Sequence, residues 1–166
     1  CDEAFSSLDA STRDGLLELF GTLQREQALT CLFISHDMKA VARISGRMGV
    51  LSRGELVETG RTRSVCTDPW HPYTKQLLLS MPAPDPLRAG RKKGILFREK
   101  STELSGREGG AHRGCPFAEN CPYAMDCCRE ETPDSYVFGE RTVKCFLYSE
   151  EHSGRRAEGY KMTSQI

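Results

Sequence analysis

The spacing of hydrophobic residues changes along the first eighty positions, and each change predicts a different element. From 10 to 27 apolar residues recur every three or four positions, which is the period of an amphipathic helix. From 29 to 34 they follow one another without polar alternation, as in a parallel strand that is buried on both faces. Asp9 or Ser11 can cap the start of the helix. Its expected apolar contacts are Leu16, Leu19, Phe20 and Leu23.

Beyond Ile34 the pattern predicts short elements with tight connections. The sequence Ser52-Arg53-Gly54 separates two apolar runs and is typical of a β-hairpin turn. Pro69 and Pro72 set a rigid entry to a helix whose apolar contacts are Leu77, Leu78 and Met81. The predicted elements are a short helix from Met38 to Ile44, hairpin strands at 48–51 and 55–58, a brief helix at 61–66 and a helix at 73–80.

The composition shifts at Pro82, and this shift predicts a division of the chain. Prolines, then a basic run from 88 to 100, then Gly, Ser and Glu are typical of a solvated linker; a contact of the basic run with a lipid surface or an acidic partner is the alternative. The predicted units are an α/β domain portion at 1–81, a linker at 82–111, a cysteine-rich module at 112–148 and a polar tail at 149–166.

Charge and cysteine content narrow the classes of function. Lys and Arg number 23, as do Asp and Glu, so no global field attracts nucleic acid, and we expect no nucleic-acid partner. No apolar run approaches the roughly 18 residues of a membrane span. Of eight cysteines, five crowd the second half, which favours a metal or cluster site over disulfides.

The candidate catalytic residues lie at the ends of two expected strands. Asp2 and Glu3 form an acid pair; one carboxylate can hold Mg²⁺ through water while its neighbour polarises a water for attack on a phosphoryl group. His36 directly follows the predicted strand at 29–34, and the carboxyl ends of parallel strands line one crevice. We therefore expect His36 beside the acid pair, where it can donate a hydrogen bond to a phosphate oxygen.

Three segments together resemble motifs of the ABC-transporter ATPases. In order and at fitting spacing, Asp2-Glu3 is similar to the Walker B motif, Ser6-Ser7-Leu8-Asp9 to the D-loop, and Ile34-Ser35-His36-Asp37 to the H-loop. The hairpin segment 54–60 is similar to the exit from the ATPase core in that family. Ala4-Phe5 departs from the pattern, because many members have proline after the acid pair.

This resemblance implies a P-loop NTPase fold with ATP and Mg²⁺ as cofactors. By position, Asp2 would serve Mg²⁺, Glu3 the attacking water and His36 the γ-phosphate, while Asp9 would belong to the contact across the ATPase dimer. The sequence contains no Gly-x-x-x-x-Gly-Lys-Ser/Thr loop and no Leu-Ser-Gly-Gly-Gln-like signature, both of which precede Walker B in this family. We therefore expect a C-terminal portion of a subunit that hydrolyses no ATP by itself.

A second resemblance narrows the family. The segment His71-Pro72-Tyr73-Thr74-Lys75, followed by a short helix, resembles the ATPase subunits of oligopeptide and dipeptide importers, including related nickel importers. The same residues also predict a proline-set helix start with Tyr73 packed on the core, and both interpretations hold together.

Four cysteines in the spacing C-x5-C-x6-C-x16-C match the C-terminal extension of that subfamily: Cys115, Cys121, Cys128 and Cys145. Four thiolates can hold zinc or an iron–sulfur cluster, and the tight C-x2–4-C pairs usual for zinc are absent. This favours a cluster, with zinc and free or paired thiols as alternatives, and the resemblance implies [4Fe–4S] in some members. Cys127 and Cys128 compete for the third position, and the family pattern favours Cys128.

The resemblance implies an ATP-hydrolysing subunit of a peptide importer at the cytoplasmic face of the cell membrane. Its partners would be a second ABC ATPase subunit and two permeases, with an extracytoplasmic solute-binding protein acting indirectly. One alternative is a non-enzymatic iron–sulfur or metal-binding regulatory module with an ATPase remnant, and another is a soluble ABC ATPase outside transport. The intact acids and His36 weigh against the first, and the His71 segment and the cysteines against the second.

Overall fold

The computed structural model describes residues 1–5, 7–81 and 114–151. The predicted linker at 82–111 and the predicted tail beyond Glu151 lie outside the described residues, as do Ser6 and the first two residues of the predicted cysteine-rich module. None of the helices within the described ranges combines the length and apolarity that a membrane crossing requires.

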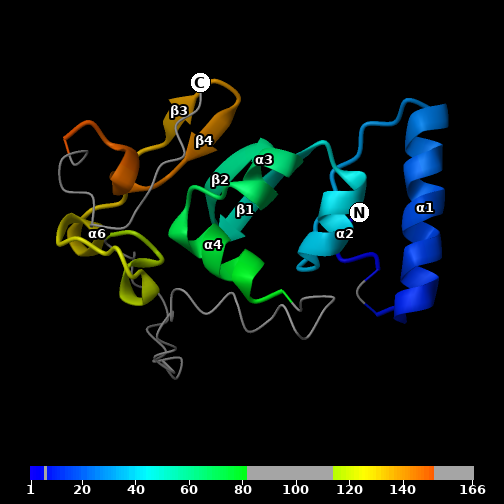
Figure 1. Ribbon diagram of the computed structural model, residues 1–166, viewed down its shortest axis with the longest axis horizontal. Coiled ribbons are helices and arrows are strands. Elements are labelled where there is room, and N and C mark those ends of the chain that lie inside the picture. The colour runs from blue at the N-terminus through cyan, green and yellow to red at the C-terminus, as the bar shows by residue number, and fades with distance from the viewer. Residues whose placement is uncertain (6, 82–113, 152–166) are drawn as a thin grey trace.

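Two helices stand at one end of the molecule (Figure 1). Helix α1 spans Ala10–Glu26 and helix α2 spans Met38–Ile44, as the sequence predicts. The predicted apolar stripe of α1 is wrong in detail, because Leu17 is buried while Leu19 and Leu23 are 55% and 42% exposed. The reason is that α2 packs on the face of α1 that carries Leu17, and Arg43 of α2 pairs with two acids of that face, Asp14 and Glu18.

The buried parallel strand expected at 29–34 does not form in this structure. Parallel pairing is confirmed only as a single bridge between Asp2 and Ile34. Leu32 is 76% exposed and Ile34 is 49% exposed. The apolar run has the composition of a buried strand, but burial also needs neighbours, and the segment beginning at Cys1 is its pairing partner within the described residues.

The predicted hairpin is confirmed. Strand β1 covers Arg47–Ser52 and pairs in antiparallel fashion with strand β2, Glu55–Arg61. Arg53 and Gly54 between them have φ angles of 48° and 84°, and two successive positive φ values characterise the type I′ turn that matches the twist of paired strands. Helix α3, Thr62–Thr67, follows the hairpin, and helix α4 spans Pro72–Leu79.

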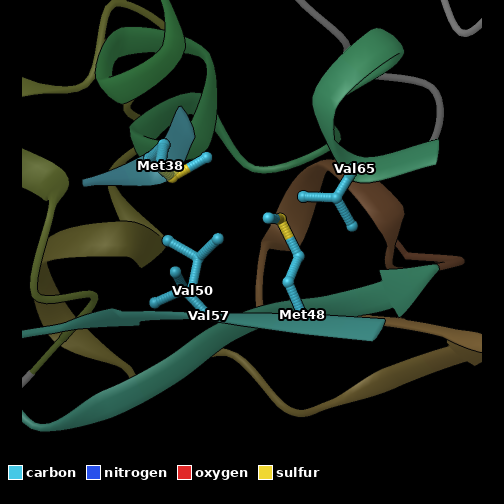
Figure 2. Close-up of a cluster of buried hydrophobic side chains, with 5 residues drawn as sticks. All are labelled: Met38, Met48, Val50, Val57 and Val65. Atoms are coloured by element: carbon cyan, nitrogen blue, oxygen red, sulfur yellow. The ribbon is translucent and has the colours of Figure 1, made fainter. Parts of the chain in front are cut away.

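A small apolar core forms where the hairpin, α2 and α3 meet. Figure 2 shows Met48, Val50 and Val57 of the hairpin directed toward Met38 and Val65. Burial of such side chains stabilises a fold by about 1.5–3 kcal/mol each. The predicted contacts of α4 are confirmed, since partly buried residues pack around this core: Tyr73, Leu77, Leu78 and Met81.

The cysteine-rich part joins the hairpin through a shared sheet. Strand β3, Tyr136–Phe138, pairs with β4, Arg141–Val143, and β4 pairs with β2 through Glu58↔Val143 and Thr59↔Thr142. The sheet order is β1-β2-β4-β3, antiparallel throughout, and the fold is mixed α/β. The remaining elements are helix α6, Cys127–Glu130, and two 3-10 turns, η2, Ala118–Asn120, and η3, Phe146–Tyr148.

Candidate functional site

The structure brings Glu3 and His36 into direct contact. Nδ1 of His36 lies 3.1 Å and 3.0 Å from the two carboxylate oxygens of Glu3, and the His36 backbone amide donates to Oε1 at 3.1 Å. A carboxylate only accepts, so Nδ1 is the donor in this pair. The two side chains are 77% and 41% exposed, in the order His36 and Glu3. The pair is therefore open to a ligand from solvent.

Backbone pairing places these two side chains. The amide of Ile34 donates to the Cys1 carbonyl at 2.8 Å, and the amide of Glu3 donates to the Ile34 carbonyl at 2.9 Å. Glu3 itself has a φ of 48°, an uncommon conformation for a residue with a side chain. Such conformations cluster at functional sites, where the surrounding structure holds them. The exposed Asp2 belongs to the same segment and forms the bridge to Ile34.

Two further aspartates of these motifs cap helices. Asp9 is the N-cap of α1 and accepts from the Thr12 amide at 3.0 Å, and this bond lowers the pKa of its carboxyl. Asp37 is the N-cap of α2 and also pairs with Arg13 of α1 at 3.0 Å. These contacts fix the starts of both helices, and they give Asp9 a local structural role as a helix cap.

The second candidate site is a small cavity that all four predicted cysteines line. Cys115, Cys121, Cys128 and Cys145 share its wall with apolar side chains such as Phe117 and Leu147. Cys127 is not among the lining residues. The four cysteines of the predicted spacing therefore lie around one cavity in this structure, and Cys127 does not line it.

Each of these four sulfurs has backbone amides beside it. The Met125 amide donates to Sγ of Cys128 at 3.4 Å. For each of the other three, a hydrogen bond from the backbone amide two residues later in the sequence favours the thiolate: Phe117 for Cys115, Tyr123 for Cys121, and Leu147 for Cys145. Amides aimed at sulfur favour a thiolate, which is the form that binds metals.

Burial opposes that ionisation. It raises the pKa of Cys121 to about 12, and it also raises the pKa of Cys115 and of Cys145. Repulsion from the neighbouring thiolates adds a smaller rise in pKa for Cys121 and Cys145, and repulsion from Glu55 does so for Cys115. The thiols are therefore protonated at neutral pH unless a cation compensates the charge. Within the described ranges, no group of three or more His, Cys, Asp or Glu side chains is arranged to hold a metal ion.

Gly114 allows the cavity walls to meet. Its φ is +106°, and a Cβ at this position would lie 2.6 Å from the Arg129 carbonyl oxygen and 2.7 Å from that of Cys128. The next amide, of Cys115, donates to the Cys128 carbonyl at 2.8 Å. Only glycine fits this approach, which ties the first and third cysteines together.

A buried carboxylate that sequence reasoning missed joins α4 to the cysteine-rich part. Both oxygens of Glu58 accept backbone amides, from Trp70 and His71, each at 2.9 Å. Arg141 of β4 donates to the same carboxylate at 2.7 Å and lies 3.8 Å from the centroid of the Trp70 ring. The Glu58 side chain is fully buried. A charge buried so completely requires such partners.

His71 connects this junction to the cavity. It is the N-cap of α4, with Nδ1 accepting the Tyr73 amide at 3.1 Å, and Pro72 is the first residue of the helix. The expected proline-set helix start is confirmed. His71 is also 1% exposed and lines the cysteine cavity. The sequence predicted that this segment identifies the family, but it did not predict that the His71 ring lines the cysteine cavity.

Comparison with known proteins identifies relatives of this chain. Residues 57–128 match the family described as the oligopeptide/dipeptide transporter, C-terminal region. A Brucella abortus protein named for peptide import and ATP binding is 40% identical over 148 residues, 89% of this chain and 42% of that protein. The oligopeptide transport ATP-binding protein AppF of Bacillus subtilis is 36% identical over 151 residues, 89% of this chain and 44% of AppF.

The Salmonella typhimurium oligopeptide transport ATP-binding protein OppF is 37% identical over 134 residues, covering 80% of this chain and 39% of OppF. The chain therefore spans about two fifths of the length of the curated relatives it matches. The chain corresponds to the C-terminal region of an oligopeptide/dipeptide ABC transporter ATP-binding protein.

Proposed function

We propose that this chain carries the catalytic carboxylate and histidine of the ATP-hydrolysing subunit of an oligopeptide or dipeptide ABC importer, within a P-loop NTPase fold. The observation that carries the proposal is the direct contact of Glu3 with His36 at the ends of two segments paired in parallel. The similarity to proteins named for peptide import and ATP binding supports the substrate class.

The roles of the site residues follow from their chemistry. Asp2 would hold Mg²⁺ of the nucleotide through water, and Glu3 would polarise the attacking water. Because Nδ1 of His36 already donates to Glu3, its Nε2 can donate to the γ-phosphate only from a doubly protonated ring or after the Glu3 contact breaks. Asp9, at the start of α1, would meet the partner ATPase subunit.

The whole subunit would act as one of a pair beneath two membrane permeases, at the cytoplasmic face of the membrane. An extracytoplasmic solute-binding protein would deliver the peptide to the permeases. Closure of the ATPase pair on ATP and its reopening after hydrolysis would drive uptake. Catalysis would rest on positioning and electrostatics, because phosphoryl transfer leaves the protein little covalent chemistry.

A chimera tests this proposal. Residues 1–166 replace the matching region of AppF, and ATP hydrolysis and peptide uptake are measured in cells that lack AppF. We expect both activities, and we expect Glu3→Gln to lower hydrolysis about 10²–10⁴-fold with ATP binding retained, since the general base is lost. Glu119→Gln, the same change at an exposed position, is the matched control. Equal hydrolysis by the Glu3→Gln chimera would contradict the assignment.

We also propose that Cys115, Cys121, Cys128 and Cys145 bind a [4Fe–4S] cluster with a structural or regulatory role. The support is that the four thiols line one cavity and each has a backbone amide beside it. The donor set fits, because thiolates are the usual cluster ligands. Zinc is the alternative, and for either metal the ligands would have to move closer together on binding, since no three such side chains in the described ranges are arranged to hold a metal ion.

Iron and sulfide analysis of the anaerobically purified chain tests the cluster. We expect about four irons per chain and a visible charge-transfer band, both lost in Cys121→Ser. Cys127→Ser is the matched control, because it makes the same change on a thiol outside the cavity lining, and it should keep the iron. Stoichiometric zinc without iron would overturn the proposal. Retention of iron by Cys128→Ser but not by Cys127→Ser would reverse the choice of third ligand.

A further inference from the structure

The side chain of Arg13, in the first turn of α1, joins two segments that carry expected site residues. Its Nη2 donates to the Leu8 carbonyl at 2.9 Å, and its Nη1 donates to the Asp37 carboxylate at 3.0 Å. Leu8 directly precedes Asp9, and Asp37 directly follows His36. One guanidinium therefore links the segment before α1 to the loop that carries the candidate catalytic histidine.

The geometry of this guanidinium suits two acceptors. Its N–H donors form a rigid planar fork, so one group can hold two acceptors in a fixed relation. Both hydrogen bonds are partly buried, whereas Nε of Arg13 is buried without a hydrogen-bond partner among the described residues. An unsatisfied buried donor is costly. The side chain keeps an orientation that leaves Nε unsatisfied, which indicates that the two Nη bonds determine that orientation.

The carboxylate of Asp37 extends the link to His36. Its Oδ1 accepts two amides of the first turn of α2, at 2.9 Å and 3.2 Å, while its Oδ2 accepts Arg13. The preceding residue, His36, contacts the Glu3 carboxylate through both its amide and its ring. A shift of Asp37 moves the backbone of His36 with it, because the peptide bond that joins them is rigid. The orientation of His36 toward Glu3 therefore depends on the position of Asp37.

We propose that Arg13 is a positioning residue, which holds His36 against Glu3 by clamping Asp37 to the Leu8 carbonyl. This inference rests on the proposed function, since it concerns the same catalytic pair. Loss of the Arg13 side chain should leave the catalytic side chains present but free the start of α2 to move. His36 would then contact Glu3 for a smaller fraction of the time.

A second ion pair between the same two helices provides the matched control. Arg43 of α2 pairs with Asp14 and Glu18 of α1, and these side chains are more exposed than those of the Arg13 pair. Arg13→Met and Arg43→Met make the same chemical change, and each retains an apolar stem. A role in helix packing alone predicts equal effects of the two variants, whereas the positioning role predicts an effect of Arg13→Met only.

The first measurement is hydrogen exchange of the His36 amide, followed by NMR in the 166-residue chain. This amide donates to Oε1 of Glu3 at 3.1 Å, so its exchange rate reports the contact without any need for ATP hydrolysis. We expect Arg13→Met to accelerate the exchange about tenfold, as the loss of a hydrogen bond to a charged group does, and Arg43→Met to leave it unchanged. An unchanged rate in a folded Arg13→Met variant would overturn the inference, as would equal acceleration in Arg43→Met.

Asp37→Asn tests the same link from its other end. Asparagine still caps a helix, so α2 keeps its start, but the amide nitrogen that then faces Arg13 is itself a donor. Arg13→Met, Asp37→Asn and the double variant should all accelerate the exchange of the His36 amide equally, because each breaks the same link. Additive effects would contradict an action of Arg13 through Asp37.

The second measurement is ATP hydrolysis by membranes that contain the AppF chimera. We expect Arg13→Met to lower kcat about tenfold with the KM for ATP unchanged, because the residue orients the catalytic pair and does not bind the nucleotide. A raised KM with an unchanged kcat would overturn the inference. If the wild-type chimera hydrolyses no ATP, the proposed function fails, and the exchange rates still decide whether Arg13 positions His36.

Discussion

Glu58 is the residue whose replacement should most disturb the junction between α4 and the cysteine-rich part. Its carboxylate accepts two amides at 2.9 Å and the Arg141 guanidinium at 2.7 Å. Glu58→Gln keeps the shape but converts one oxygen into an amide donor. That donor must then face Trp70 N–H, His71 N–H or Arg141, all of which are donors themselves, and Arg141 loses its buried counter-charge.

The magnitude follows from burial. The Glu58 side chain is fully buried and that of Arg141 is 13% exposed, so solvent screens the pair little. Removal of one partner of a buried ion pair costs about 3–5 kcal/mol, because it leaves the other charge uncompensated. That loss is a large part of the roughly 5–15 kcal/mol by which a typical domain is stable. We therefore expect Glu58→Gln to lower the free energy of unfolding by about 3–5 kcal/mol.

The only tryptophan of the chain makes this loss measurable. Trp70 lies under Arg141 and stacks on Tyr148 with ring centroids 5.3 Å apart, so its emission reports on the junction itself. Urea unfolding followed by Trp70 fluorescence gives the free energy. Glu140→Gln, the same change in the exposed pair with Arg61, should leave the unfolding midpoint unchanged.

An unfolding free energy of Glu58→Gln within about 0.5 kcal/mol of the wild type, with unchanged Trp70 emission, would refute the reasoning, because surface substitutions have effects of that size. A double-mutant cycle with Arg141→Met separates the ion pair from the two amide bonds.

Two further changes test local features. Gly114→Ala should lower both the iron content expected of the proposed cluster and the urea midpoint of unfolding, because its Cβ would meet two backbone carbonyl oxygens. Gly15→Ala, with open space around it, should be neutral or stabilising. Equal behaviour of the two variants would contradict this steric explanation. The free energy of unfolding of Asp37→Asn should fall less steeply at acid pH than that of the wild type. Partial burial raises the pKa of Asp37, but hydrogen bonds from the Ala40 amide and Arg13 outweigh it, so the folded-state pKa falls below the ordinary 3.8. Its contribution is complete above pH 3.8 and is lost as the pH falls further, and an acid limb of unchanged steepness would contradict it.

The features that the sequence predicted correctly are those that local chemistry decides. Arg53-Gly54 supplies the positive φ values of a hairpin turn without help from distant residues. Asp9 caps α1 with a side chain three residues from its donor, and the helix starts where the periodicity begins. Proline at 72 fits the first turn of α4 because that position needs no amide hydrogen.

The features that the sequence did not predict depend on neighbours far along the chain. Leu32 belongs to an apolar run with the composition of a buried strand, yet it is exposed because burial is decided by what packs on it. Strands β3 and β4 have three residues each, too few to show an alternation. The partnership of Glu58 with Arg141 spans 83 positions, and nothing in the hairpin segment 54–60 indicates that its Glu58 pairs with Arg141.

The two candidate sites also differ in how their parts reach one another. Glu3 and His36 meet through adjacent backbone segments, so the end of an apolar run was enough to predict their contact. The cysteine cavity instead depends on β2. This strand pairs with β4, and its Glu58 side chain holds the start of α4. Cys145 lies two residues beyond β4, and His71 is the residue that Glu58 fixes. The His-Pro-Tyr segment therefore places one wall of the thiol cavity, and for this reason a change at Glu58 should alter the shape of that cavity as well as the stability.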